Sequence, residues 1–194
     1  MSRRLFLALW PTDRTRAALV ATSRAALRAG GGRAVPAGHL HLTLAFLGAV
    51  PVRQMDRFEA FAPIALPEFE LVLDHFGHWR GPRILWLGPR RCPPGLTALV
   101  AQIRARLDAL GLPCDRRAFK PHVTLARKVR TLPELEPPVP VSWPVRGFAL
   151  VETVAASGGS VYEVRRRFPI ASPSADSPAS APFCAGSRHD PKQD

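Results

Sequence analysis

Short apolar or alternating segments occur between longer segments with helical spacing over most of this chain. Seven segments are typical of strands: 5–9, 39–46, 69–76, 83–87, 122–127 and, approximately, 145–152 and 160–168. Three segments are predicted to be helices: from Thr12 or Asp13 to about Ala29, about 52–62, and Leu96 to Leu110. Glycines at 30–32 and at 111 would end the first and the last helix. The mixture indicates an α+β fold.

The order of these elements occurs twice. A strand, a helix and a strand that carries a histidine appear in each half of the chain. His41 follows Leu5 by 36 positions, and His122 follows Ile84 by 38. A repeat of this kind predicts two similar, pseudo-symmetric lobes that share a central cleft. We assign this bilobal domain to residues 1–170.

Residues 171–194 differ in composition from the rest of the chain. They are rich in serine, proline and alanine and have no hydrophobic period. Such a segment buries too little apolar surface to offset the entropy lost on ordering. We therefore predict a disordered tail at 171–194 that takes no part in the chemistry.

The two histidine-bearing strands share the pattern His-x-Thr-Leu-Ala, at 41–45 and at 122–126. Side chains two positions apart on a strand point to the same face, so His41 and Thr43 should lie together. The same holds for His122 and Thr124, while the apolar residues between them face the core. Lobes packed about a twofold axis would bring all four polar groups into one cleft.

This set of groups suits the opening of a cyclic phosphodiester. An imidazole has a pKa near 6.5 and can accept or donate a proton near neutral pH. One histidine can take a proton from water while the other protonates the leaving oxygen, which predicts a bell-shaped rate profile between roughly pH 5 and 8. The hydroxyls can donate hydrogen bonds to the phosphoryl oxygens. The near symmetry of the motifs leaves open which histidine is the acid.

We predict neither a metal nor another cofactor. His39 and His41 could chelate a metal together with His122, but no nearby carboxylate or cysteine completes a set of ligands. The glycines at 30–32 lack the Lys-Ser/Thr that a phosphate-binding loop requires.

The motif pair in this order resembles that of the 2H phosphoesterases, which are named for two such histidine motifs. Within that superfamily the chain resembles the RNA 2′,3′-cyclic phosphodiesterases, historically called 2′-5′ RNA ligases. The resemblance covers roughly residues 3–169 and is carried by 4–9, 39–48, 119–127 and 161–164. It implies a bilobal α+β fold with the motifs facing across a cleft, and hydrolysis of a 2′,3′-cyclic phosphate to a 2′-phosphate. It also implies that His41 is the proton donor and that His122 is the proton acceptor.

Three further residues are candidates for substrate binding. The resemblance implies a phosphate contact directly after the second motif, at Arg127. Simple alternation turns Arg127 away from His122, so it would reach the cleft only where the strand ends or bulges. Phe46 has the matching position in the first half and could stack on a base, with core packing as the alternative. Lys120 belongs to a basic cluster near the second motif that could guide RNA, or could simply be solvated.

The net charge of +12 favours an anionic partner, with nucleic acid the usual one. The predicted tail carries three acidic and two basic residues, so the charge belongs to the body of the chain. An arginine-rich composition offers a plainer explanation, since 24 of the 27 basic residues are arginine. The three cysteines are widely spaced, which favours a reducing cytoplasm. No apolar run is long enough for a membrane span.

We therefore expect a cytoplasmic, monomeric enzyme that acts on RNA with a 2′,3′-cyclic phosphate end. A second hypothesis keeps the site and changes the substrate to a small cyclic nucleotide or 2′-5′ linked RNA, by hydrolysis or by ligation. A third hypothesis is a non-catalytic module that binds RNA or nucleotides.

Overall fold

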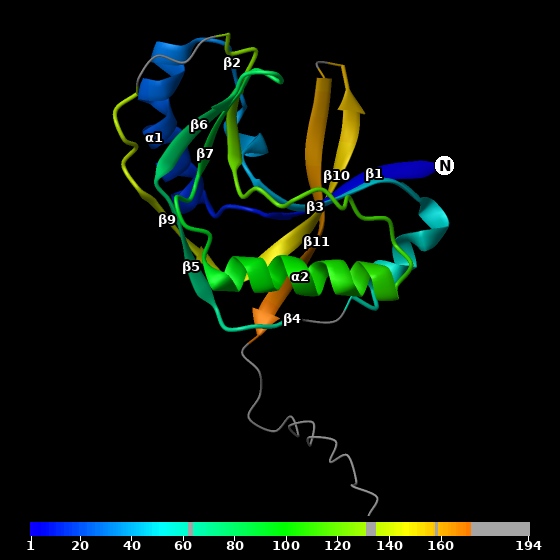
Figure 1. The fold of residues 1–194 in the computed structure, drawn as a ribbon. Coiled ribbons are helices and arrows are strands. Elements are labelled where there is room, and N and C mark those ends of the chain that lie inside the picture. The colour runs from blue at the N-terminus through cyan, green and yellow to red at the C-terminus, as the bar shows by residue number, and fades with distance from the viewer. Residues whose placement is uncertain (62–63, 131–134, 158, 172–194) are drawn as a thin grey trace, which may run out of the picture.

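A computed structural model describes residues 1–61, 64–130, 135–157 and 159–171. Within these residues, two helices accompany a nine-stranded sheet and a two-stranded sheet (Figure 1). The elements are β1 (Ser2–Leu9), α1 (Asp13–Gly30), β2 (Arg33–Ala34), β3 (Leu42–Pro51), β4 (Ile64–Ala65), β5 (Phe69–Leu73), β6 (His75–Trp79), β7 (Ile84–Gly88), α2 (Pro94–Ala109), β8 (Val123–Arg127), β9 (Val141–Val145), β10 (Gly147–Ala156) and β11 (Gly159–Ala171). Short 3₁₀ helices span Ala37–His39 and Val52–Phe58.

The large sheet consists of two parts joined by one residue pair. Its order is β4-β11-β10-β1-β3-β8-β7-β6, with β2 paired to β8. The strands β3 and β8 are hydrogen-bonded neighbours only at Leu42 and Val123. We call the side with β1, β3, β10 and β11 the first lobe, and the side with β2, β6, β7 and β8 the second lobe. The two side chains at the joint are fully buried, each 0% exposed.

Each lobe combines elements from both halves of the sequence. The helix α1 follows β1 of the first lobe, yet it contacts β8 of the second lobe and β9. The helix α2 follows β7 of the second lobe, yet it contacts β3 of the first lobe, together with β4 and β5. The expected bilobal α+β fold is therefore confirmed, with the two halves of the repeat interlocked.

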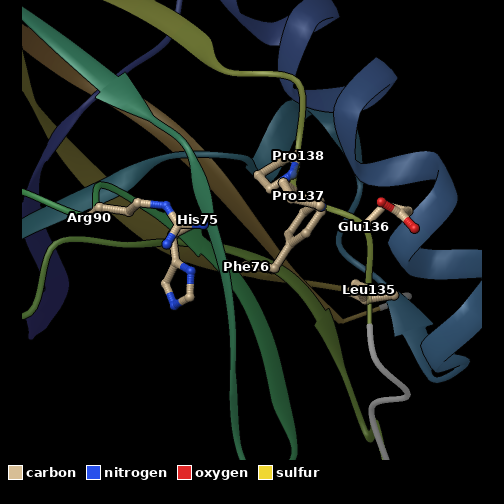
Figure 2. A pocket seen from close by; sticks show the side chains of 7 residues that line it. All are labelled: His75, Phe76, Arg90, Leu135, Glu136, Pro137 and Pro138. Atoms are coloured by element: carbon tan, nitrogen blue, oxygen red, sulfur yellow. The ribbon is translucent and has the colours of Figure 1, made fainter.

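The segment 69–76, expected to be one strand, forms two strands in different sheets. β5 pairs with β9 in the small sheet, and β6 pairs with β7 in the large sheet. The break falls at Asp74, whose Oδ1 accepts a hydrogen bond of 2.8 Å from the backbone N–H of Arg90. Figure 2 shows that Phe76 and His75 then point to opposite sides of β6. The hydrophobic alternation runs through the break, so it could not reveal the change of partner.

The segment 52–62 was expected to be a helix with one apolar side. The structure has a 3₁₀ helix there that ends at Phe58, the only buried residue in it. Val52, expected on the apolar side, is 43% exposed. The segment is therefore not an α-helix, but it contributes Phe58 and Phe61, each 2% exposed, to the main core.

The helices end where their flanking residues predict. Thr12 caps α1, since its hydroxyl accepts a hydrogen bond of 3.3 Å from the backbone N–H of Thr15. Gly31, at a φ of 63°, donates its N–H to the carbonyl of Leu27 and closes the helix. Gly111, at a φ of 60°, follows the end of α2 in the same way.

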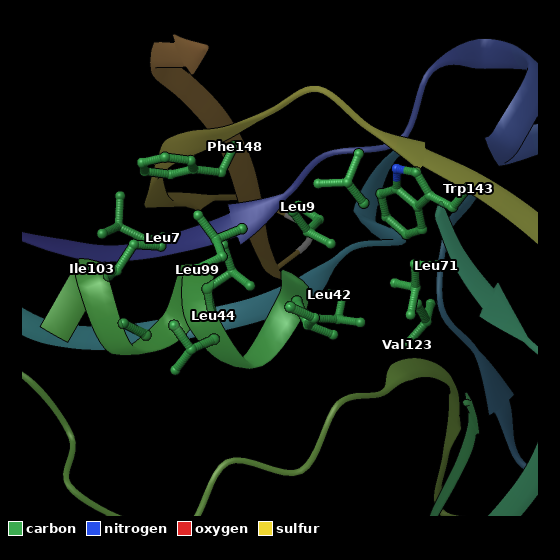
Figure 3. Packing of buried hydrophobic residues seen from close by; sticks show 14 of the residues in the cluster. Leu7, Leu9, Leu42, Leu44, Leu71, Leu99, Ile103, Val123, Trp143 and Phe148 are labelled. Atoms are coloured by element: carbon green, nitrogen blue, oxygen red, sulfur yellow. The ribbon is translucent and has the colours of Figure 1, made fainter. Parts of the chain in front are cut away.

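The main core lies between α2 and one face of the sheet (Figure 3). Apolar side chains at helical spacing on α2 meet those that alternate along β1 and β3; the buried residues of α2 are Leu96, Leu99, Val100, Ile103 and Leu107. A second cluster of buried residues covers the opposite face of the first lobe: Phe6, Ala8, Ala149 and Val151. The first lobe therefore has one face against the helix and another turned toward the histidine motifs.

The C-terminal strand extends one residue beyond the predicted domain boundary. Ile170 and Ala171 pair in parallel with Ile64 and Ala65 of β4, so Ala171 belongs to the sheet. The rest of the predicted tail, 172–194, lies outside the described residues. Cys92 and Cys114 are free thiols. Neither α1 nor α2 combines the length and the apolar character that a membrane crossing requires.

We expect Leu42→Ala to lower the free energy of unfolding by about 2–5 kcal/mol, because it empties a buried position at the joint between the lobes. Urea unfolding followed by circular dichroism measures the loss. Val139→Ala is the control, since Val139 is 76% exposed and its truncation should change stability by less than about 0.5 kcal/mol. Equal stability of the two variants would contradict the packing described for the joint.

Candidate active site

The two histidines lie at the joint between the lobes. Each one directly precedes its strand, His41 before β3 and His122 before β8. The pair Leu42–Val123 is antiparallel, so one further step in this register aligns His41 with Thr124 and Thr43 with His122. Because Leu42 and Val123 point into the core, their neighbours on both strands turn to the opposite face. The four predicted catalytic groups therefore share one face beside the joint.

A β-bulge in β8 determines where Arg127 points. Leu85 pairs with Ala126 and the next residue, Trp86, pairs with Thr124, so Leu125 is an extra residue on β8. The side chains of Leu125 and Ala126 are both buried. The bulge reverses the alternation, and the exposed Arg127 follows on the face of Thr124 and His122.

The first motif has the same bulge at its leucine. Leu7 pairs with Ala45 and Ala8 pairs with Thr43, which leaves Leu44 as the extra residue. The next residue after the buried Ala45 is Phe46, which is 49% exposed. This exposure excludes core packing, the alternative that the sequence left open for Phe46. The leucine of each motif therefore directs the residue two positions later toward the face of the histidines.

The backbone fixes the orientation and the tautomer of both imidazoles. Nδ1 of His41 donates to the carbonyl of His39, and Nδ1 of His122 donates to the carbonyl of Lys120, each over 2.7 Å. A carbonyl only accepts hydrogen bonds, so Nδ1 carries the proton in each neutral ring and Nε2 keeps a free lone pair. The hydroxyl of Thr43 lies 3.1 Å from Nε2 of His41 and can donate to it.

Three aromatic rings surround His41. The ring centroids of Phe6, Tyr162 and Trp10 lie 4.9, 5.2 and 5.8 Å from that of the imidazole. Burial among these rings disfavours the charged imidazolium and lowers the pKa of His41 from 6.5 to about 4. The hydrogen bond to His39 opposes this shift, whereas the charges of His122, His39 and Arg127 add to it.

His122 has a lowered pKa for the same reasons. Burial is the largest cause, and the charge of Arg127 adds to it, while the hydrogen bond to the carbonyl of Lys120 opposes it. Trp79 lies edge-on to the imidazole at a centroid distance of 4.6 Å. The charge of Arg127 therefore lowers the pKa of both histidines. This agrees with the bulge in β8, which turns the Arg127 side chain toward their face.

Lys120 has a backbone contact with the site in addition to the role predicted for its side chain. Its side chain is exposed, and its backbone carbonyl orients His122. His39 has the same relation to His41. No sequence signal beyond the repeat itself marks these two carbonyls, because any residue type provides one.

Sequence reasoning missed the rings that contact the histidines. Phe6 belongs to the predicted strand 5–9 and Tyr162 to the segment 161–164 that carries the resemblance, but neither was given a role. Trp10 and Trp79 were not singled out. Phe6 and Ala8 alternate with core leucines along β1, so they turn to the opposite face, toward His41. Strand alternation could have placed Phe6 on that face, but not beside a histidine from another strand.

The described residues hold no group of three or more His, Cys, Asp or Glu side chains arranged to bind a metal. Two surface hollows lie outside the site. One, of about 160 Å³, is lined by His75, Phe76, Arg90 and residues 135–138 (Figure 2). The other, of about 310 Å³, lies between α1 and residues 139–141 and is lined mostly by apolar side chains.

Comparison with known proteins identifies the arrangement. The family model described as the 2′-5′ RNA ligase superfamily matches residues 11–156. The RNA 2′,3′-cyclic phosphodiesterase of Escherichia coli is 36% identical over 141 residues, which cover 72% of this chain and 80% of that protein. The protein of the same name from Thermus thermophilus is 33% identical over 180 residues, with coverage of 86% and 90%.

The solved structures agree with the sequence relatives. The apo crystal structure of Escherichia coli LigT matches with a TM-score of 0.79 and 32% identity, over 88% of this chain and 98% of that one. LigT has also been solved in complex with 3′-AMP, at a TM-score of 0.78, 32% identity and coverage of 88% and 99%. The fold is thus that of the 2H phosphoesterases, with one histidine motif contributed from each side of the joint.

The chain belongs to the 2′-5′ RNA ligase superfamily.

Proposed function

We propose that this protein is an RNA 2′,3′-cyclic phosphodiesterase that opens a terminal cyclic phosphate to a 2′-phosphate. One observation carries the proposal. Two imidazoles at the joint of the lobes each donate from Nδ1 to a backbone carbonyl, so each has its Nε2 left for proton transfer, beside the Thr43 hydroxyl in the case of His41. The same activity appears in the names of relatives that are 33–36% identical over most of the chain.

In the proposed reaction, Nε2 of His122 takes a proton from water as the water oxygen attacks phosphorus. The bond between phosphorus and the 3′-oxygen breaks, and His41 transfers its Nε2 proton to that oxygen. The products are a 2′-phosphate and a 3′-hydroxyl. His122 is left protonated and His41 neutral, and proton exchange with solvent restores the starting state of the pair. The hydroxyls of Thr43 and Thr124 donate to the non-bridging oxygens, where charge increases in the transition state.

Arg127 and Phe46 divide substrate binding in this proposal. The guanidinium of Arg127 binds the anionic phosphoryl oxygens, for which its paired N–H donors are well suited. The exposed ring of Phe46 stacks on the terminal base. Complexes of Escherichia coli LigT with 3′-AMP and with phosphate show that a protein of this fold binds such groups. For Lys120 we propose attraction of the RNA by its exposed charge.

Hydrolysis of an oligoribonucleotide with a 2′,3′-cyclic phosphate end tests the function. The reaction is run with a chelator, and the product is identified by ³¹P NMR against authentic 2′- and 3′-phosphates. We expect the 2′-phosphate. A 3′-phosphate as the sole product, or an inert protein, would reject the proposal. Monomeric state and cytoplasmic location stay predictions from the sequence.

We expect both inflection points in the profile of kcat/KM against pH to lie below pH 6.5. This ratio reports the free enzyme, in which the pKa of His41 is lowered to about 4 and that of His122 is lowered from 6.5. Above both values the singly protonated pair decreases, so kcat/KM should fall about tenfold per pH unit. The profile predicted from unperturbed histidines, between roughly pH 5 and 8, thus moves to lower pH.

Bound substrate should move the profile of kcat in the opposite direction. A phosphodiester anion beside the imidazoles favours their charged forms and raises both pKa values. Initial rates from pH 4 to 9 at constant ionic strength give both profiles. A kcat/KM that stays constant up to pH 8 would contradict the lowered pKa values.

A further inference from the structure

A row of four aromatic rings extends from the candidate site across the second lobe. The centroid distances are 4.6 Å from His122 to Trp79, 5.5 Å from Trp79 to Trp86 and 5.7 Å from Trp86 to His75. The last three residues lie on β6 and β7. We call these four residues the aromatic row. It begins at a proposed catalytic group and ends on β6, the last strand in the order of the large sheet.

The pairing of the strands explains why the row lies on the face of the site. Trp86 pairs with Thr124 on one side and with Gly77 on the other. Residues paired across strands share a face, so Trp86 points to the same side as Thr124. The row and the proposed catalytic groups therefore form one continuous surface.

Gly77 allows Trp86 to lie over β6. A Cβ at position 77 would be 2.0 Å from the nearest atom of the indole, so only glycine permits this arrangement. Gly88 makes a similar allowance, since its Cβ would lie 3.0 Å from the indole and 2.7 Å from the carbonyl oxygen of Pro121. The two glycines let the indole lie close to the backbone of the sheet.

The side-chain contacts of Trp86 are aromatic: its ring is tilted by 41° to that of Trp79 and lies edge-on to that of His75. Its Nε1 is buried and has no hydrogen-bond partner among the described residues. A buried indole N–H without an acceptor disfavours this orientation. The indole N–H therefore does not explain why a tryptophan occupies this position. The contacts of its ring with Trp79 and His75 do explain it. The side chain is partly exposed, so part of its surface can receive a ligand.

Cationic side chains flank the row. Arg80 follows Trp79 in the turn between β6 and β7, Arg83 precedes β7, and all three arginines at 80, 83 and 90 are exposed. Figure 2 shows Arg90 beside His75 at the outer end of the row. Asp74 and Glu136 are the acidic residues nearby, and Asp74 binds the backbone of Arg90. Aromatic rings bordered by arginines suit single-stranded nucleic acid, whose bases stack while its phosphates meet the cations.

We infer that the rings of the aromatic row beyond His122, those of Trp79, Trp86 and His75, bind the bases of the nucleotides that precede the cyclic phosphate, so that the preferred substrate is a single-stranded oligoribonucleotide. The inference rests on the proposed function, since it extends the same site. Phe46, on the first lobe, serves the terminal base, and the row on the second lobe serves the nucleotides before it. Stacking does not depend on base identity. The row therefore raises the affinity for longer RNA and gives little preference for one sequence over another.

Turnover of two substrates separates the row from the site itself. One substrate is a cyclic mononucleotide and the other a trinucleotide with the same cyclic end. We expect Trp86→Ala to lower kcat/KM for the trinucleotide about 10-fold, mainly through KM, and to change that for the mononucleotide less than about 2-fold. Trp86→Phe keeps a ring and should restore most of the loss. Phe46→Ala is the control, since it should lower kcat/KM for both substrates by the same factor.

The mononucleotide also reports folding, because a misfolded variant would lose both activities. An equal loss on both substrates, or no loss on the trinucleotide, would overturn the inference. Should the parent open no cyclic phosphate, the proposed function fails, and the row is tested by binding alone. Fluorescence anisotropy of a labelled trinucleotide with a 2′-phosphate end then compares the parent with Trp86→Ala, and equal affinity overturns the inference.

Discussion

His41→Ala and His122→Ala should each lower kcat on RNA with a 2′,3′-cyclic phosphate end by about 10²–10⁴-fold, the effect of losing a general acid or base. The reason is geometric. Each Nε2 is held on the shared face by a hydrogen bond of 2.7 Å from Nδ1 to a backbone carbonyl. Alanine removes the proton carrier and leaves the strand unchanged. Single-turnover rates with saturating enzyme measure the loss without interference from product release.

A histidine outside the site provides the control for this experiment. Nε2 of His78, on β6, lies 3.1 Å from the carbonyl of Val129, so His78→Ala should leave kcat within about twofold of the parent. The pH profiles of the site variants assign the roles. Loss of the acid should remove the alkaline limb, and loss of the base the acidic limb. Full activity of either site variant would refute the two-histidine mechanism.

Arg127→Met should lower kcat/KM by about 10–100-fold, the effect of losing a charged hydrogen bond to phosphate. It should also raise the pKa of both histidines, because the charge of Arg127 lowers both in the folded protein. NMR titration of the imidazole C–H signals measures the two pKa values in the absence of substrate. A merely solvated arginine would leave them unchanged.

Arg127→Lys separates the charge from the shape of the guanidinium. Lysine keeps the positive charge, so the pKa values of both histidines should stay low. It lacks the paired donors of arginine, so kcat/KM should fall between those of the parent and Arg127→Met. Histidine pKa values that rise equally in both variants would show that the effect on them is not one of charge.

Local sequence signals were sufficient for the elements that bear the site. The pattern His-x-Thr-Leu-Ala identified both histidine strands, and alternation correctly assigned Leu42 and Val123 to the core. The caps of α1, Thr12 and Gly31, also acted as predicted, because a cap depends on neighbours in the chain.

The features that the sequence could not supply depend on contacts between distant segments. A bulge is defined by the register of two strands, so the extra residue Leu125 cannot be recognised without its partner β7. The burial of His41 depends on Phe6, Trp10 and Tyr162, which are brought together only by β1 and β11. Its lowered pKa was for this reason beyond sequence analysis.

The joint at Leu42 and Val123 makes the two motifs nearly equivalent, and this raises a question of direction. A site with perfect twofold symmetry would accept a phosphate ester in two opposite orientations, and only one would place the correct oxygen beside the acid. The bulges turn an aromatic ring, Phe46, toward one side and a cation, Arg127, toward the other. This difference in chemical kind between matching positions gives the face of the histidines a polarity, and we expect it to favour one of the two orientations of the ester.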